Sequence, residues 1–72
     1  MTNNFKIDWM NGDEVASTCT MDNRLAVRIL SKESGLEESF LASALCYMSS
    51  TFPIHLRTED KQYTLRIYKL EG

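Results

Sequence analysis

Apolar residues stand at every second position near the start of the chain, as Phe5, Ile7 and Trp9. A period of two residues predicts a strand with one buried face. The dipeptide Asn11-Gly12 follows, which is typical of a hairpin turn. Residues 14–20 are rich in small and β-branched types and predict a second strand. The first twenty residues are therefore expected to form a β-hairpin.

The register of this hairpin depends on the length of its turn. A three-residue turn places Trp9 opposite Val15 and Phe5 opposite Cys19, which gathers the apolar side chains on one face. A two-residue turn places Trp9 opposite Glu14 instead. The three-residue turn is the predicted one, because a one-sided apolar face can pack on a core.

The pattern over residues 22–32 fits two structures. Leu25, Val27 and Ile29 alternate with other residues as in a strand, and Asp22 belongs to a sequence suited to a turn. Leu25 and Ile29 also stand four positions apart, and Asp22 is a good N-cap for a helix. The alternation favours a strand, with a helix as the alternative.

A helix is predicted over residues 34–50. Ser34 and Glu37 have the spacing of a capping box, in which each side chain bonds the backbone of the other residue. Pro53 disfavours helical geometry at the residue before it and ends the element. The apolar stripe expected to face the core consists of Leu36, Phe40, Leu41, Ala44, Leu45, Tyr47 and Met48.

Two further alternating stretches, over residues 54–58 and 63–68, predict a second hairpin. A tight turn at Glu59-Asp60 makes the apolar faces of the two strands coincide. The expected cross-strand pairs are Leu56–Tyr63 and Ile54–Leu65.

These elements predict an α+β fold, in which an antiparallel sheet packs against one main helix in two layers. The expected order is β-β-β-α-β-β, and the alternative is a winged-helix-like β-β-α-α-β-β. With 72 residues, the chain is expected to form a single domain over residues 1–72.

Charge and cysteine content limit the partners and the cellular compartment that we expect. Eight basic against ten acidic residues give a formal charge of −2, which argues against non-specific coating of nucleic acid. No apolar run approaches the roughly 20 residues that span a bilayer, and residues 1–4 lack the features of a secretion signal. Cys19 and Cys46 are expected to be buried, reduced thiols, with a single disulfide as the alternative. We therefore expect a cytoplasmic protein with no membrane contact.

The sequence offers little for catalysis. It has one histidine, His55, and no nucleophile elbow or phosphate-binding glycine loop. Glu37 and Glu38 are adjacent on the expected helix and diverge by about 100°, which makes them a poor acid–base pair. Two cysteines and one histidine do not complete a four-ligand zinc site. We expect no enzyme activity, no catalytic residues, no metal and no cofactor.

Two surfaces are candidates for partner binding. The outer face of the second hairpin combines basic and aromatic side chains, which suit an acidic partner or single-stranded nucleic acid. The far side of the helix carries small, uncharged residues, which let another protein approach closely. The hairpin candidates are His55, Arg57, Arg66 and Tyr68, and the helix candidates are Ser39, Ala42, Ser43, Cys46 and Ser49.

The favoured function is protein–protein contact through the helix, as a regulator or inhibitor of a larger partner or as a homodimer. Arg57 and Arg66 are expected to give charge complementarity at the rim. The small size suits accessory proteins carried by viruses of bacteria. The alternative is a winged-helix-like or sheet-face nucleic-acid binder, against which the would-be recognition helix counts, because it holds Glu37 and Glu38 and no basic residue.

Overall fold

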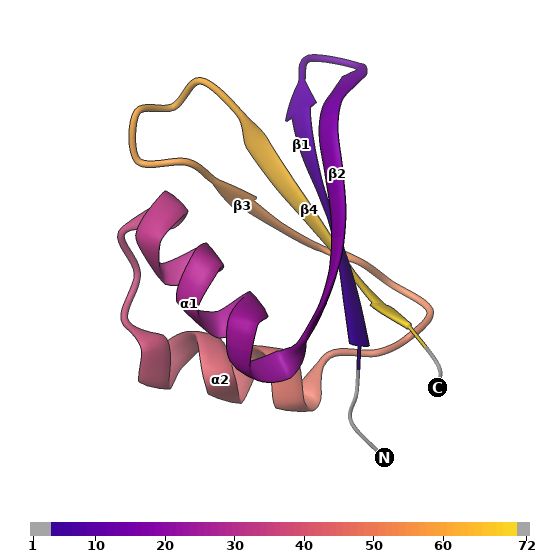
Figure 1. The fold of residues 1–72 in the computed structure, drawn as a ribbon, viewed down its shortest axis with the longest axis vertical. Coiled ribbons are helices and arrows are strands. Elements are labelled where there is room, and N and C mark those ends of the chain that lie inside the picture. The colour runs from indigo at the N-terminus through magenta and orange to yellow at the C-terminus, as the bar shows by residue number, and fades with distance from the viewer. Residues whose placement is uncertain (1–3, 71–72) are drawn as a thin grey trace.

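The computed structural model describes residues 4–70, which form two β-hairpins joined by a pair of helices (Figure 1). The α+β class is confirmed, and the order is the alternative one, β-β-α-α-β-β. The elements are β1 (Asn4–Asn11), β2 (Glu14–Asp22), α1 (Asn23–Ser34), α2 (Glu38–Tyr47), β3 (Ile54–Arg57) and β4 (Thr64–Leu70).

The favoured strand over residues 22–32 is wrong, because residues 23–32 belong to the first helix, α1. Asp22 is its N-cap, and the Leu25 backbone N–H donates to Asp22 Oδ1 over 2.9 Å. Gly35 ends the helix in the left-handed conformation, at φ 77°, and its N–H donates to the Ser31 carbonyl. Alternation alone favoured a strand, but capping at both ends and an inward-facing stripe stabilise the helix. That stripe consists of Ala26, Val27 and Leu30.

The predicted capping box is also wrong. Ser34 is the last residue of α1, and its hydroxyl donates to the Leu30 carbonyl over 2.6 Å. Because Ser34 is itself helical, it cannot cap the next helix. The second helix, α2, begins at Glu38, and its N-cap Glu37 makes no side-chain capping bond. α2 therefore begins later and ends earlier than the helix predicted over residues 34–50, and it has ten residues.

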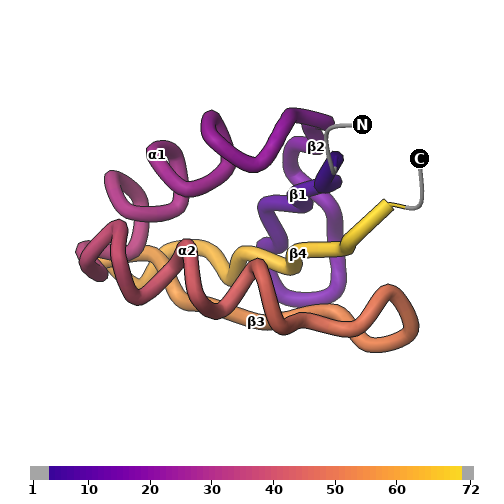
Figure 2. Tube along the Cα trace, turned by 90° about the horizontal axis from the view of Figure 1, so that it is seen from below, coloured from indigo at the N-terminus to yellow at the C-terminus, as the bar shows by residue number. Residues whose placement is uncertain are grey.

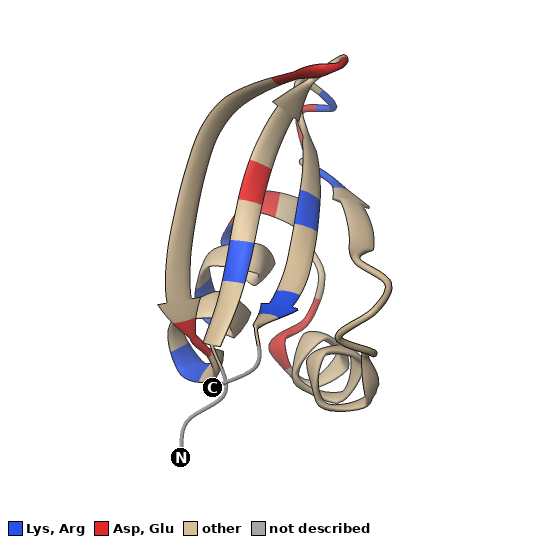
Figure 3. Cartoon of the chain, turned by 90° about the vertical axis from the view of Figure 1, so that its right-hand side faces the viewer, with Lys and Arg blue, Asp and Glu red and all other residues tan. Residues whose placement is uncertain are grey.

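The strands form one antiparallel sheet in the order β2-β1-β4-β3. Both helices lie on the same side of it, and Figure 3 shows the strands in front of α1. In Figure 2, α2 lies beside α1 and runs along the side of the sheet that ends in β3. The other side of the sheet, which we call the open sheet face, carries no helix.

The register of the first hairpin differs from the prediction. Its turn is Gly12-Asp13, with Gly12 at φ 64°, and a bulge interrupts the pairing between Trp9 and Met10. Because of the extra bulge residue, the pairs from Trp9 to the start of the strand differ from those that either predicted turn would give. The observed pairs are Trp9–Ser17, Ile7–Cys19 and Phe5–Met21.

The second hairpin is also shifted, by two residues. The predicted tight turn is replaced by a wider loop, in which the Thr58 N–H donates to the Tyr63 carbonyl over 3.0 Å. Leu56 therefore pairs with Leu65, and Ile54 pairs with Ile67. A shift by an even number keeps every side chain on its predicted face, so the face assignment survives the wrong register.

The core lies between the sheet and the helical pair. The two central strands and both helices supply its fully buried side chains, and α2 contributes from one narrow side only. These residues are Phe5, Ile7, Leu30, Leu41, Leu45, Leu65 and Ile67.

Candidate functional site

The exposed side of α2 is uncharged from Ser39 to Tyr47. Of the ten helix residues, only Leu41 and Leu45 are buried, and Glu38 is the only charged one. We call the exposed set the α2 surface. It consists of Ser39, Phe40, Ala42, Ser43, Cys46 and Tyr47.

The structure thus places four helix candidates, Ser39, Ala42, Ser43 and Cys46, together on this surface. The fifth, Ser49, follows the end of the helix and is also exposed. No residue between 39 and 47 carries a charge, so a contacting protein would not have to desolvate an ion there.

Two aromatic residues predicted for the core lie on this surface instead. Phe40 is 57% exposed and Tyr47 is 88% exposed, and Phe52 in the following loop is 72% exposed. The reason is the first helix, α1, which the favoured prediction lacked. Because α1 packs on β1 and β2, α2 reaches the core only through a narrow stripe, and the other half of its apolar residues stays outside.

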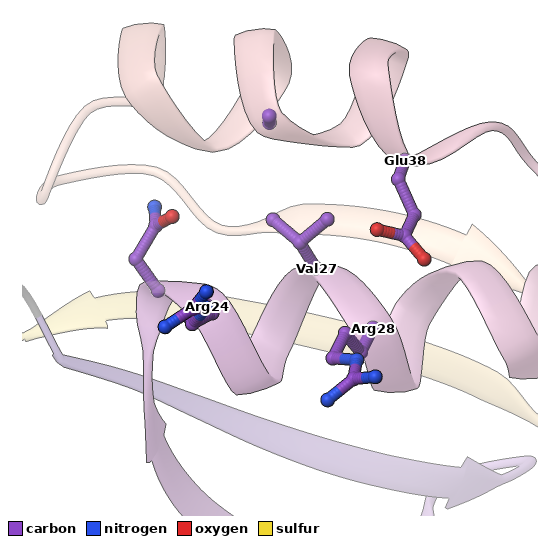
Figure 4. A pocket seen from close by; sticks show the side chains of 6 residues that line it. Arg24, Val27, Arg28 and Glu38 are labelled. Atoms are coloured by element: carbon purple, nitrogen blue, oxygen red, sulfur yellow. The ribbon is translucent and has the colours of Figure 1, made fainter.

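A hollow of about 550 Å³ separates α1 from α2 at the molecular surface (Figure 4). Arg24 and Arg28 line it from α1, one helical turn apart, and Glu38 reaches into it from α2. Val27 of α1 and Ala42 of α2 are its apolar lining residues. None of the three charged side chains makes an ion pair with any of residues 4–70. The hollow therefore adds unpaired charge beside the uncharged α2 surface.

The open sheet face gathers the hairpin candidates as the alternation predicted. His55 pairs with Arg66 across β3 and β4, and Arg57 pairs with Thr64, so that these side chains share one face with Tyr68. The strand order adds a neighbour that the sequence pattern did not reveal, since β1 lies beside β4 and places Lys6 opposite Tyr68.

A row of polar side chains crosses this face, centred on Asp8, which is only 3% exposed. Thr18 Oγ1 on β2 donates to Asp8 Oδ1 over 2.6 Å, and Arg66 Nη2 on β4 donates to Asp8 Oδ2 over 3.4 Å. Lys6 Nζ lies 4.0 Å from Asp8 Oδ1. The carboxylate of Asp8 therefore ties three neighbouring strands together.

The aromatic candidate on this face is also engaged. The ring of Tyr68 has the Lys6 ammonium and the Arg66 guanidinium each 5.3 Å from its centroid, within the range of cation–π attraction. Arg66 and Tyr68 thus have partners inside the molecule, whereas Arg57 is exposed and makes no ion pair with any described side chain.

Asp8 was not among the residues singled out from the sequence. Alternation places it on the face opposite Ile7 and Trp9, and the sheet order makes β1 a central strand with neighbours on both sides. Only the pairing of β1 with β4 brings Arg66 to Asp8, which are 58 residues apart in sequence. Local alternation carries no signal for such a contact.

Both cysteines are exposed, which corrects the prediction that they are buried. Cys19 lies on the edge strand β2 and Cys46 on α2, and both are free. The helices do not extend under the outer part of β2, and every residue from Glu14 to Thr20 is exposed.

Within residues 4–70, Asp60 has a lowered pKa. The Gln62 backbone N–H and the Thr58 hydroxyl, which donate to Asp60 Oδ1 over 3.0 and 2.7 Å, lower the pKa of this exposed carboxyl. His55 is exposed on β3. Across residues 4–70, no three histidine, cysteine or acidic side chains lie close enough to hold a metal ion, and no helix could cross a bilayer.

Comparisons with protein families, with curated proteins and with solved structures find no match for the chain. Function is therefore inferred from the arrangement of its own residues.

Proposed function

We propose that this protein is a non-enzymatic binding domain that acts through protein–protein contact at the α2 surface, as a regulator or inhibitor of a larger protein. The observation that carries the proposal is the exposure of Phe40 and Tyr47 on a helix that holds no charge after Glu38. Two free cysteines fit a reducing compartment, and we place the protein in the cytoplasm.

The chemistry of this surface matches the centre of a protein interface. Such centres are depleted of charged residues and enriched in aromatic ones, and an arginine at the edge supplies orientation. The α2 surface has aromatic side chains and small hydroxyl residues, with Arg24 and Arg28 beside it across the hollow. The helices cover one side of the sheet, and Arg57 and Arg66 lie on the other side, the open sheet face. These two arginines therefore do not share one surface with α2. We therefore assign the rim role to Arg24 and Arg28.

Affinity capture with matched baits tests this proposal. Ser43→Arg puts a long cation in the middle of the α2 surface, while Gln62→Arg adds the same charge on the exposed β3–β4 loop. We expect a specific partner to bind the wild type and Gln62→Arg and to be lost with Ser43→Arg, both variants keeping the wild-type circular dichroism. A partner retained equally by all three baits contradicts the proposal.

The open sheet face favours one second candidate, binding of single-stranded nucleic acid. Lys6, His55, Arg57, Arg66 and Tyr68 lie on this face, and basic groups beside a ring are typical of such sites. The internal pairing of Arg66 and Tyr68 counts against it. Binding of a labelled oligonucleotide that falls steeply with salt and disappears in the double variant Arg57→Ala, Arg66→Ala would favour this candidate; no binding at low salt would exclude it.

A further inference from the structure

We propose that in the free protein the α2 surface is covered by a second copy of the same chain, through antiparallel pairing of the two α2 helices about a two-fold axis. This inference rests on the proposed function, because it names the occupant of the same surface. A two-fold interface requires a patch that is complementary to itself. The aromatic residues, the small residues and the charges beside α2 each meet this requirement.

The aromatic residues are placed symmetrically along the helix. Phe40 and Tyr47 are seven positions apart, which is two helical turns, so both lie along the same flank of α2. An antiparallel partner whose two-fold axis passes beside Ser43 and Ala44 brings Phe40 of each copy to Tyr47 of the other. Two exposed aromatic side chains per chain would thus become two buried aromatic pairs per dimer.

The middle of the surface permits a close approach. Ser39, Ser43 and Cys46 lie between the aromatic flank and the flank that faces α1, and all three are small and exposed. The distance between packed helices is set by the side chains at the contact and is shortest where these are small. No charged side chain of α2 would be buried at the centre of this contact.

The charges beside α2 are complementary under the same symmetry. Glu38 lies at the amino end of α2, and Arg24 of α1 lies toward the carboxyl end of α2, as Figure 4 shows. Antiparallel pairing brings Glu38 of the second copy toward Arg24 of the first, and the two-fold axis repeats the contact. Neither residue makes an ion pair within residues 4–70 of its own chain, so both charges remain available.

The dimer gives the proposed binding function a means of regulation. A larger partner that uses the α2 surface would compete with the second copy, because both need Phe40 and Tyr47. Binding of the partner would then depend on the concentration of this chain, and dilution would expose the surface.

A charge-swap experiment tests the dimer and its geometry together. Wild type should sediment at twice the chain mass of 8.3 kDa at high concentration. Arg24→Glu and Glu38→Arg should each weaken the dimer by about tenfold or more, since each places like charges together twice. An equimolar mixture of the two variants should dimerise like wild type, because one chain then supplies both acids and the other both arginines. Native mass spectrometry should show the heterodimer only.

Several results would overturn the inference. A wild-type chain that stays monomeric at about 1 mM has no dimer of useful affinity. Variants that dimerise as wild type does, or a mixture that stays monomeric, exclude the Arg24–Glu38 contact. Circular dichroism of each variant verifies the fold, and Arg57→Glu, on the open sheet face, is the control that should leave the dimer intact.

The proposed function and this inference fail separately. If the chain is monomeric while Ser43→Arg still abolishes capture of a larger partner, the α2 surface binds another protein and the second copy is excluded. If wild type dimerises with the charge-swap behaviour but captured proteins are indifferent to Ser43→Arg, the dimer stands and regulation of a larger partner through α2 does not.

Discussion

The open sheet face and the α2 surface differ in whether their side chains have partners within the chain. On the sheet, Asp8 accepts from Thr18 and Arg66, and Tyr68 lies beside two cations, so much of the polar chemistry is satisfied inside the chain. On α2, Phe40 and Tyr47 project into solvent. The sheet face carries basic and aromatic groups suited to binding, but Arg66 and Tyr68 contact other side chains of the same chain. What a surface leaves unpartnered is therefore a better indicator of an interface than which residue types it holds.

The two surfaces also differ in what keeps them in place. The polar row joins three strands and so contributes to the sheet itself, whereas α2 is anchored by a few apolar side chains. Substitutions on the sheet should therefore change stability, and substitutions on the outer side of α2 should change association alone.

The largest expected effect separates the inner side of α2 from its outer side. Leu41 is 1% exposed, and Leu41→Ala should lower the free energy of unfolding by about 3 kcal/mol, because it leaves a cavity between the helices and the sheet. Phe40→Ala, at the adjacent position, should change it by less than about 0.5 kcal/mol. Urea denaturation followed by circular dichroism measures both.

The milder variant Leu41→Val keeps this test informative if Leu41→Ala does not fold, since it should be intermediate. Equal losses for Leu41→Ala and Phe40→Ala would mean that the outer side of α2 is part of the folded core, and the α2 surface would lose its claim to be an interface.

The second effect concerns the buried carboxylate on the sheet. Asp8→Ala should destabilise the protein by about 2 kcal/mol, because it leaves the Thr18 hydroxyl and the partly buried Arg66 guanidinium without their acceptor. Lys6→Ala should have little effect, since Lys6 is half exposed and lies 4.0 Å from Asp8.

A double-mutant cycle with Arg66→Ala isolates the Asp8–Arg66 contact. A coupling energy near zero would mean that Arg66 is free to bind a ligand, and the second candidate function would gain weight over the α2 surface.

The strands and α2 could be predicted from the sequence, because the hydrophobic period of each element depends on residues that are close together in the chain. Alternation gave three of the four strands with their correct faces, and a long apolar stripe gave α2. The residues of the second hairpin kept their faces because its register error was an even-numbered shift, whereas the bulge in the first hairpin places Val15 opposite Met10 instead of Trp9.

The remaining features depend on contacts that local patterns do not encode. The bulge after Trp9 and the wide Thr58–Tyr63 loop set the registers, and neither follows from the turn residues alone. Over residues 22–32 the sequence fitted both a strand and a helix, and the packing of α1 on the sheet decided between them. The exposure of Phe40 and Tyr47 follows only once α1 is known to cover the sheet.

A third, smaller effect tests whether the edge strand joins the polar row. Thr18→Val removes the hydroxyl that donates to Asp8 over 2.6 Å and should lower stability by about 1 kcal/mol. Thr20→Val, on the same exposed strand, removes a hydroxyl for which the structure shows no hydrogen bond and is the matched control. Thermal unfolding of the two variants compares them. If both variants melt alike, the row ends at Asp8 and β2 is held by its backbone ladder alone.

The smallest expected effect is a pH dependence from the β3–β4 loop, where an exposed polar contact can be compared with the buried one at Asp8. The Gln62 N–H and the Thr58 hydroxyl stabilise the ionised carboxylate of Asp60 and lower its pKa in the folded state. This contribution is therefore complete above the unfolded pKa, near the ordinary aspartate value of 3.8, and is lost as the pH falls through the folded pKa. Asp60→Asn should reduce the acid sensitivity of the unfolding midpoint between pH 5 and about pH 2 and leave its salt dependence unchanged. An unaltered pH profile would show that the carboxylate of Asp60 does not stabilise the loop.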